Sequence, residues 1–209
     1  MKILLDNGHG IDTPGKRSPD GHFREYAYNR YLAFLIRERL AALGLDAQLL
    51  VPEREDISLK ERCRRANAIC SQLGNNQVIL LSIHVNAAGN GQKWLNARGW
   101  CCFTTKGETR ADALASHLYE AAKNWLPEMR LRTDLSDGDP DLEQDFYLIR
   151  HTRCPAVLTE NLFMDNREDV AFLESEEGAD ALVNLHVDGL LRHITTLPAF
   201  CKEAQYMRP

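Results

Sequence analysis

The sequence has no long hydrophobic run and no excess of positive charge. No stretch of its 209 residues reaches the roughly 18 apolar residues that a membrane-spanning helix needs. Lys and Arg number 25 against 30 Asp and Glu, and the basic residues are scattered, so the chain shows no nucleic-acid footprint. The first predicted strand begins at Lys2, so we expect no signal peptide. We therefore expect synthesis in the cytoplasm, with any export by another route.

Motifs of several common enzyme classes are also missing. The chain contains no G-x-G-x-x-G, no Walker loop and no G-x-S-x-G, which disfavours nucleotide binding and serine-hydrolase chemistry. None of the six cysteines forms a C-x-x-C pair, so we expect buried free thiols rather than disulfides or a thiolate metal site. With no repeat or linker, we expect one catalytic domain over residues 1–197 and a loosely held tail at 198–209.

Apolar strands alternate with amphipathic helices along the chain. Short apolar runs predict strands at residues 2–6, 45–51, 78–83, 99–105, 146–150 and 156–159. Helical periodicity and capping patterns predict helices at residues 25–43, 58–73, 111–125 and 179–194. Residues 127–144 are polar and acidic, and we expect a loop there that faces substrate. The alternation indicates an α/β fold with a largely parallel sheet.

Three predicted strands end on residues suited to metal binding or acid–base chemistry. His9 lies in a glycine turn after the first strand, His84 follows the strand at 78–83, and Glu160 follows the strand at 156–159. Because α/β proteins bind ligands outside the carboxyl ends of their strands, we expect one site there. Glu25 begins the helix after the His9 turn and can point back toward these strand ends.

The residue types indicate a metal-dependent hydrolase. Two imidazoles and one carboxylate, here His9, His84 and Glu25, are a usual catalytic zinc set that leaves a fourth position for water. Glu160 beside that water can take its proton and pass one to a leaving amine. The ordinary alternatives are isolated surface or core residues and, for Glu160, an acid at a helix N-terminus.

Three further side chains are candidates of lesser weight. His151, at the end of the predicted strand 146–150, is the substitute metal ligand, and His22 lies in the loop before Glu25. Asn86, two residues past His84, either hydrogen-bonds substrate or closes the turn.

Five segments, taken in order, resemble those of a known enzyme family. They are the turn D-N-G-H-G at 6–10, Glu25 with Asn29, the run R-x-D-I-S-L…R…A-N at 54–67, S-I-H-V-N-A at 82–87, and P-A-V-L-T-E…F…N at 155–166. Together they resemble the zinc-dependent N-acetylmuramoyl-L-alanine amidases of the Amidase_3 type over nearly the whole chain.

The resemblance implies a fold, a cofactor and a reaction. It implies a twisted, mostly parallel sheet of about six strands flanked by helices. It places zinc on His9, Glu25 and His84, and it makes Glu160 the catalytic residue that activates the zinc-bound water. The implied reaction cuts the amide between N-acetylmuramic acid and L-alanine of the peptidoglycan stem peptide. Asn7 departs from the small residue usual before Gly-His, and we expect its amide to touch the ligand shell or substrate.

Two alternative functions remain open at this point. One is a zinc-dependent peptidase or amidase on another acyl-peptide, and the other is a peptidoglycan-binding module without activity. Without a signal peptide, the resemblance favours a phage- or prophage-type lysin acting on the cell wall over a secreted autolysin. The sequence carries no recognisable cell-wall-binding module and no indication of oligomeric state.

Overall fold

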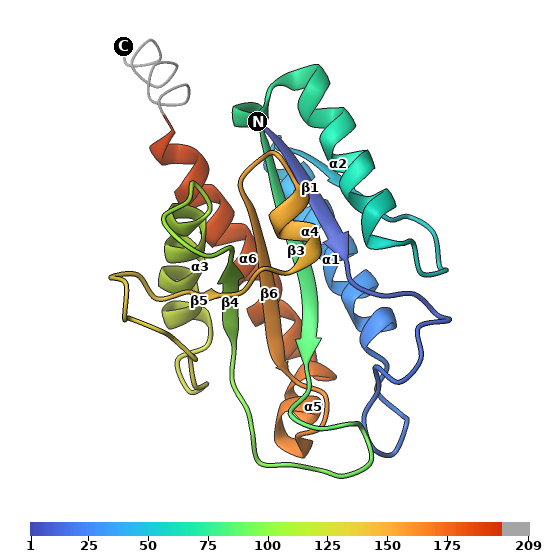
Figure 1. Cartoon of the computed structure of the whole chain (residues 1–209). Coiled ribbons are helices and arrows are strands. Elements are labelled where there is room, and N and C mark those ends of the chain that lie inside the picture. The colour runs from blue at the N-terminus through green and yellow to red at the C-terminus, as the bar shows by residue number, and fades with distance from the viewer. Residues whose placement is uncertain (198–209) are drawn as a thin grey trace.

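A six-stranded sheet forms the centre of the protein, in a computed structural model that describes residues 1–197 (Figure 1). The strands are Lys2–Asn7 (β1), Asp46–Leu49 (β2), Val78–Asn86 (β3), Cys101–Thr104 (β4), Leu142–Glu143 (β5) and Ala156–Phe163 (β6). They lie in the order β2-β1-β3-β6-β4-β5, and all neighbours are parallel except β4 and β6. The expected α/β fold with a mostly parallel sheet is confirmed, and the tail at 198–209 lies outside the described residues.

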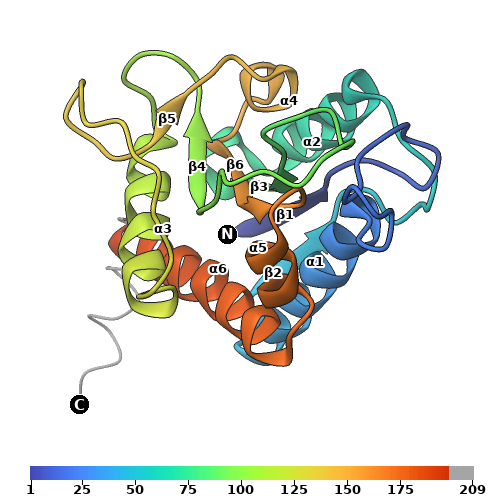
Figure 2. The ribbon, with the colours of Figure 1, turned by 90° about the horizontal axis from the view of Figure 1, so that it is seen from below.

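Helices cover both faces of this sheet (Figure 2). They are Glu25–Ala42 (α1), Leu59–Leu73 (α2), Asp112–Trp125 (α3), Tyr147–His151 (α4), Arg167–Leu173 (α5) and Glu176–Thr196 (α6). The larger core lies between the sheet and α1, α3 and α6, and a smaller one lies under α2 and α4. Strand residues alternate between the two cores, with Ile3 and Leu5 in one and Leu4 in the other. Because both faces are apolar, the strands appear in the sequence as continuous apolar runs.

The strand predicted at residues 146–150 is wrong, because this segment forms α4. Leu148 and Ile149 are adjacent and both buried, whereas Tyr147 and Arg150 are exposed. That spacing suits a helical turn and not an alternating strand. Instead, β5 at Leu142–Glu143 pairs with β4, and it lies inside the region 127–144 that was predicted as a loop.

Helix α5 was not predicted, although its start carries a local signal. The side chain of Asn166 caps the helix by accepting the backbone N–H groups of Glu168 and Asp169, both at 3.0 Å. Helix α6 begins at Glu176, three residues before the predicted start at 179, with Ser175 as its cap.

The cysteines of the described part are buried free thiols, as expected: Cys63, Cys70, Cys101, Cys102 and Cys154. Cys201 lies outside the described residues. Within residues 1–197, no helix has both the length and the apolar character that crossing a membrane requires.

Arg62 joins α2 to the end of β1 through a buried charge cluster. Its Nη1 lies 2.7 Å from Asp6 Oδ1 and its Nη2 lies 2.9 Å from Asp56 Oδ1. Ser82 Oγ donates to the other oxygen of Asp6 at 2.6 Å. The side chains of Arg62 and Asp6 are 2% and 1% exposed, so the pair is cut off from water.

Replacing Arg62 with Met is expected to lower the free energy of unfolding by about 3–5 kcal/mol, because Asp6 is left charged and buried without its partner. Denaturant titration measures this loss. Arg64→Met is the matched control, because Arg64 pairs with Glu61 at the surface, where such a pair contributes less than about 1 kcal/mol. Equal losses in the two variants would contradict the expectation.

Asp141 is a buried carboxylic acid at the end of the 127–144 region. Its residue is 1% exposed, Thr104 Oγ1 donates to its Oδ2, and its Oδ1 has no partner among residues 1–197. Burial, together with the neighbouring Asp139 carboxyl, raises the pKa of Asp141 well above its usual range. The folded chain therefore keeps this proton when the unfolded chain has lost it. Its contribution to stability is greatest in acid and falls as the pH rises above about 4.

Asp141→Asn is accordingly expected to stabilise the protein at pH 8 and to change little at pH 4. A gain of about 1 kcal/mol at pH 8 corresponds to a rise in Tm of roughly 2–4 °C in a chain of this size. Melting curves from pH 4 to pH 8 test this, with the exposed Asp137→Asn as control. A lower Tm for Asp141→Asn at pH 8 would refute the assignment.

Candidate metal centre and catalytic site

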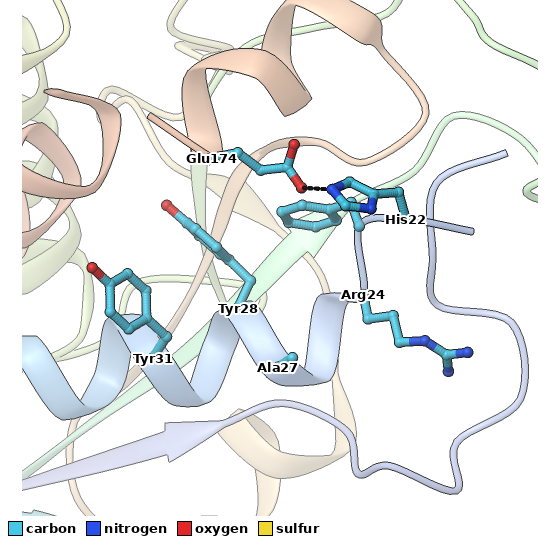
Figure 3. Close-up of a pocket in the computed structure, with 7 residues that line it drawn as sticks. His22, Arg24, Ala27, Tyr28, Tyr31 and Glu174 are labelled. Carbon is cyan, nitrogen blue, oxygen red and sulfur yellow. Dashed lines mark ion pairs between the residues drawn. The ribbon is translucent and has the colours of Figure 1, made fainter. Parts of the chain in front are cut away.

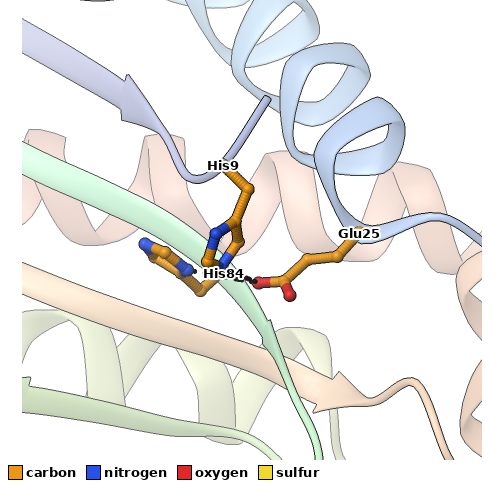
Figure 4. Close-up of side chains that lie close together, drawn as sticks. All are labelled: His9, Glu25 and His84. Atoms are coloured by element: carbon orange, nitrogen blue, oxygen red, sulfur yellow. Dashed lines mark hydrogen bonds and ion pairs between the residues drawn. The ribbon is translucent and has the colours of Figure 1, made fainter. Parts of the chain in front are cut away.

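His9, Glu25 and His84 converge at the carboxyl ends of β1 and β3 (Figure 4). Glu25 Oε1 lies 3.4 Å from His9 Nε2 and 3.1 Å from His84 Nδ1. The two imidazole rings meet edge to face with centroids 4.9 Å apart. The three residues come from a turn, a helix start and a strand, as the sequence predicted, although β3 continues two residues past His84.

His9 is held in an unusual backbone conformation. Its φ is +66°, in the left-handed region that few residues other than glycine adopt. Side chains from two helices donate hydrogen bonds to the carbonyls of this turn. From α1, Asn29 donates to Gly8 O at 3.2 Å and Arg30 donates to His9 O at 2.8 Å. From α2, Arg62 donates to Asn7 O at 3.1 Å. These contacts stabilise the strained turn and fix the direction of the His9 ring.

Gly8 is required by the close approach of His84. A Cβ atom at position 8 would lie 2.2 Å from His84 Cε1, which no side chain permits. The turn glycine therefore lets the imidazole of His84 pack directly against the backbone that follows β1.

Glu25 is charged although it is buried. Its side chain is 1% exposed, and its Oε1 accepts the backbone N–H of Val85 at 3.1 Å. Burial by itself would raise the pKa of Glu25, but hydrogen bonds with His84 and His9 outweigh it and lower the pKa well below its usual range. Burial likewise disfavours charge on His84, yet the Glu25 carboxylate raises the pKa of that imidazole.

This donor set fits zinc. Ligand atoms at the usual zinc distances form a tetrahedron with edges of about 3.3 Å, close to the two measured separations. Glu25 Oε2 is buried and accepts no hydrogen bond among residues 1–197, so this carboxylate oxygen is available to bind a cation. A cleft of about 440 Å³ is lined by His9 and His84 and reaches Ser58 and Leu59 at the start of α2.

Glu160 lies next to His84 on the neighbouring strand. The two residues are paired in the register of β3 and β6, so their side chains share one face of the sheet. Glu160 Oε2 is buried and has no hydrogen-bond donor within the described part of the chain. Burial, with a smaller contribution from Glu25, raises the pKa of Glu160 to about 7, against the opposing charges of His84 and Lys16. A carboxyl of this pKa can release and take up a proton near neutral pH.

The other candidate side chains lie elsewhere or have other partners. Asn86 Oδ1 accepts the N–H of Ala87 at 2.8 Å, so its amide oxygen closes the turn. Asn7 is 1% exposed, and neither its Oδ1 nor its Nδ2 has a hydrogen-bond partner among residues 1–197, so its contact with the ligand shell or substrate stays a prediction. His151 is not a substitute ligand: it stacks on Tyr147 at the exposed end of α4, and its Nδ1 lies 2.9 Å from Tyr147 O.

His22 also lies apart from the candidate metal ligands. Its side chain is 79% exposed and its Nε2 lies 3.5 Å from Glu174 Oε1. Figure 3 shows this pair at the rim of a separate hollow of about 330 Å³ beside Tyr28 and Tyr31 on α1.

Lys16 was not singled out in the sequence. Its Nζ lies 3.9 Å from Glu25 Oε2, and its backbone carbonyl accepts the N–H of Glu25 at 3.0 Å. It is a lysine in a polar loop, and only the fold brings it to the site, so no local pattern marks it.

Comparisons with known proteins give matches in both sequence and fold. A family model described as N-acetylmuramoyl-L-alanine amidase matches residues 3–192. The N-acetylmuramoyl-L-alanine amidase CwlM of Bacillus licheniformis is 28% identical over 195 residues, which cover 92% of this chain and 68% of CwlM. The endolysin of Bacillus phage SPP1 is 27% identical over 132 residues, covering 63% of this chain but only 44% of the endolysin. The crystal structure of an N-acetylmuramoyl-L-alanine amidase from Clostridium difficile 630 superposes with a TM-score of 0.76 at 25% identity, covering 93% of this chain and 97% of that one.

Proposed function

Because the chain belongs to the Amidase_3 family of N-acetylmuramoyl-L-alanine amidases, we propose that it hydrolyses the amide between N-acetylmuramic acid and L-alanine of the stem peptide. The observation that supports this most is the convergence of His9, Glu25 and His84 beside Glu160. The chain spans less than half of the phage endolysin that it matches, so the proposal concerns this chain alone.

His9, Glu25 and His84 are the residues that would bind zinc. When bound, zinc polarises a carbonyl and lowers the pKa of water to about 7. The protein contributes a preformed set of donors: Val85 N–H orients the Glu25 carboxylate, and Arg30 and Asn29 fix the turn that carries His9.

Glu160 carries the proton transfer in this proposal. One carboxylate oxygen accepts a proton from the attacking water, and the same carboxyl then donates a proton to the nitrogen of the departing alanine. Burial raises the pKa of Glu160, and a carboxyl that takes up a proton more readily than usual suits both steps.

The test is direct hydrolysis. The purified, zinc-loaded protein is incubated with a muramoyl-peptide, and mass spectrometry detects released peptide with a free N-terminal alanine. Hydrolysis of other acyl-peptides at a higher kcat/KM would favour the alternative peptidase or amidase. Binding of muramoyl-peptide without turnover, at full zinc occupancy, would favour the non-catalytic module.

We further propose that the protein acts on the bacterial cell wall as a lysin or autolysin, with muramic acid and the stem peptide as its partners. The similarity to a phage endolysin and to CwlM supports this setting. A clearing zone in a gel that contains purified cell walls would test it. A clearing zone that persists with the Glu160→Gln variant would show that another activity is responsible.

A further inference from the structure

A polar cluster lies in the apolar core directly behind Glu160. Thr159 and Asn161 flank Glu160 on β6, and both are fully buried on the opposite face of the sheet. His186 of α6 and Trp100 complete the cluster, and both are also fully buried. Buried polar groups among apolar side chains reduce stability unless each finds a partner, so their connections are informative.

The directions of the hydrogen bonds follow from the groups involved. His186 Nδ1 lies 2.7 Å from the carbonyl of Leu182, which only accepts, so Nδ1 carries a proton. Burial lowers the pKa of His186 to about 4, so the ring is neutral and its Nε2 is an acceptor. The hydroxyl of Thr159 therefore donates to Nε2, at 3.0 Å.

Asn161 continues this chain of hydrogen bonds to a candidate zinc ligand. Its Nδ2 donates to Thr159 Oγ1 at 3.3 Å and to the backbone carbonyl of His84 at 3.0 Å. Its Oδ1 accepts the indole N–H of Trp100 at 3.0 Å. Every polar side-chain atom of the cluster thus has a partner, and the chain of bonds runs from α6 through β6 to β3.

The backbone at this point is irregular. Between the pairs His84–Glu160 and Asn86–Phe163, β6 carries one residue more than β3, which makes a β-bulge. Leu162 in the bulge has a φ of +66°. At this irregularity the side chain of Asn161 supplies a hydrogen bond to His84 that reaches across the two strands.

We propose that Thr159 and Asn161, anchored by His186, are positioning residues that fix Glu160 relative to His84. This rests on the proposed function, since it assigns the cluster a role in that reaction. Without the cluster, the bulge would leave the base free to shift relative to the zinc ligand, and a small displacement of a catalytic group reduces the rate strongly.

The first test compares isosteric variants. Thr159→Val removes the hydroxyl and Thr159→Ser retains it. Thr104→Val is the control, because Thr104 is also buried in this sheet but donates its hydrogen bond to Asp141, outside the cluster. Thr159→Val is expected to lower kcat by about 10–100-fold, and Thr159→Ser and Thr104→Val to stay within about threefold of the wild type. Because the role is positioning, KM should change far less than kcat in Thr159→Val.

The second test needs no substrate. Asn161→Leu removes the hydrogen bond to the carbonyl of His84. We expect Asn161→Leu and Thr159→Val to weaken zinc binding by about 10–100-fold, measured in competition with a chelator. The control Thr104→Val should not change zinc affinity. If the wild type cleaves no muramoyl-peptide, the proposed function fails, and the zinc affinities still decide whether the cluster positions His84. The proposal would be overturned if Thr159→Val and Asn161→Leu had the same zinc affinity and kcat as Thr104→Val. It would also be overturned if Thr159→Ser were as impaired as Thr159→Val.

Discussion

Replacing Glu160 with Gln is expected to lower kcat for muramoyl-peptide hydrolysis by about 10²–10⁴-fold, the usual contribution of a general acid–base. Gln has nearly the same shape but takes no proton from water and returns none to the amine. Zinc binding should be retained, since Glu160 is not one of the three converging ligands. Steady-state kinetics, with zinc content measured on the same samples, check both statements.

Glu128→Gln is the matched control, because Glu128 is exposed and lies in the turn after α3. It removes the same charge and should leave kcat unchanged. If Glu160→Gln kept full activity with zinc bound, Glu160 would not be the base, and the proton transfer would have to be assigned to another group.

Loss of the imidazole of His9 or His84 is expected to abolish zinc binding and, with it, activity. The decrease in zinc affinity should exceed the roughly 10–100-fold that loss of an outer-shell partner causes, because a direct ligand is removed. Metal analysis after dialysis against a weak chelator measures it for His9→Ala and His84→Ala.

His22→Ala separates ligand loss from loss of any nearby histidine. His22 is exposed and paired with Glu174, so this variant should bind zinc as the wild type does. Removing zinc from the wild type with a strong chelator should abolish activity, and adding zinc back should restore it. A His9→Ala protein with one tightly bound zinc would refute the assigned site.

The sequence predicted the parts of the site that depend on local pattern. Apolar runs marked β1, β3 and β6, and the rule that parallel strands share a carboxyl edge placed His9, His84 and Glu160 together. Glu25 was predicted because it begins the helix that follows the His9 loop and can therefore point back toward the strand ends. The family resemblance then connected the four residues to one reaction.

The predictions that were wrong, and the residues that the sequence did not reveal, depend on contacts between residues that are distant in sequence. The apolar run at 146–150 is too short for its period to decide between helix and strand. In the fold it belongs to helix α4, and Leu142–Glu143 pairs with β4 instead. No local pattern marks His186, because its partner Thr159 is 27 residues away. Lys16 reaches Glu25 only through the path of its loop.

The shared register of β3 and β6 has a consequence for how the protein loses activity. From Leu80–Ala156 to His84–Glu160 the two central strands pair residue by residue, so Glu160 and His84 are a fixed strand spacing apart. Amides of central strands are usually the last to exchange with solvent, at the cost of global unfolding. This half of the site therefore persists until the whole domain opens, whereas His9 and Glu25, on a turn and a helix end, can fray earlier. Partial inactivation at moderate temperature should accordingly be reversible, because the His9 turn and the start of α1 can refold against strands that have stayed paired.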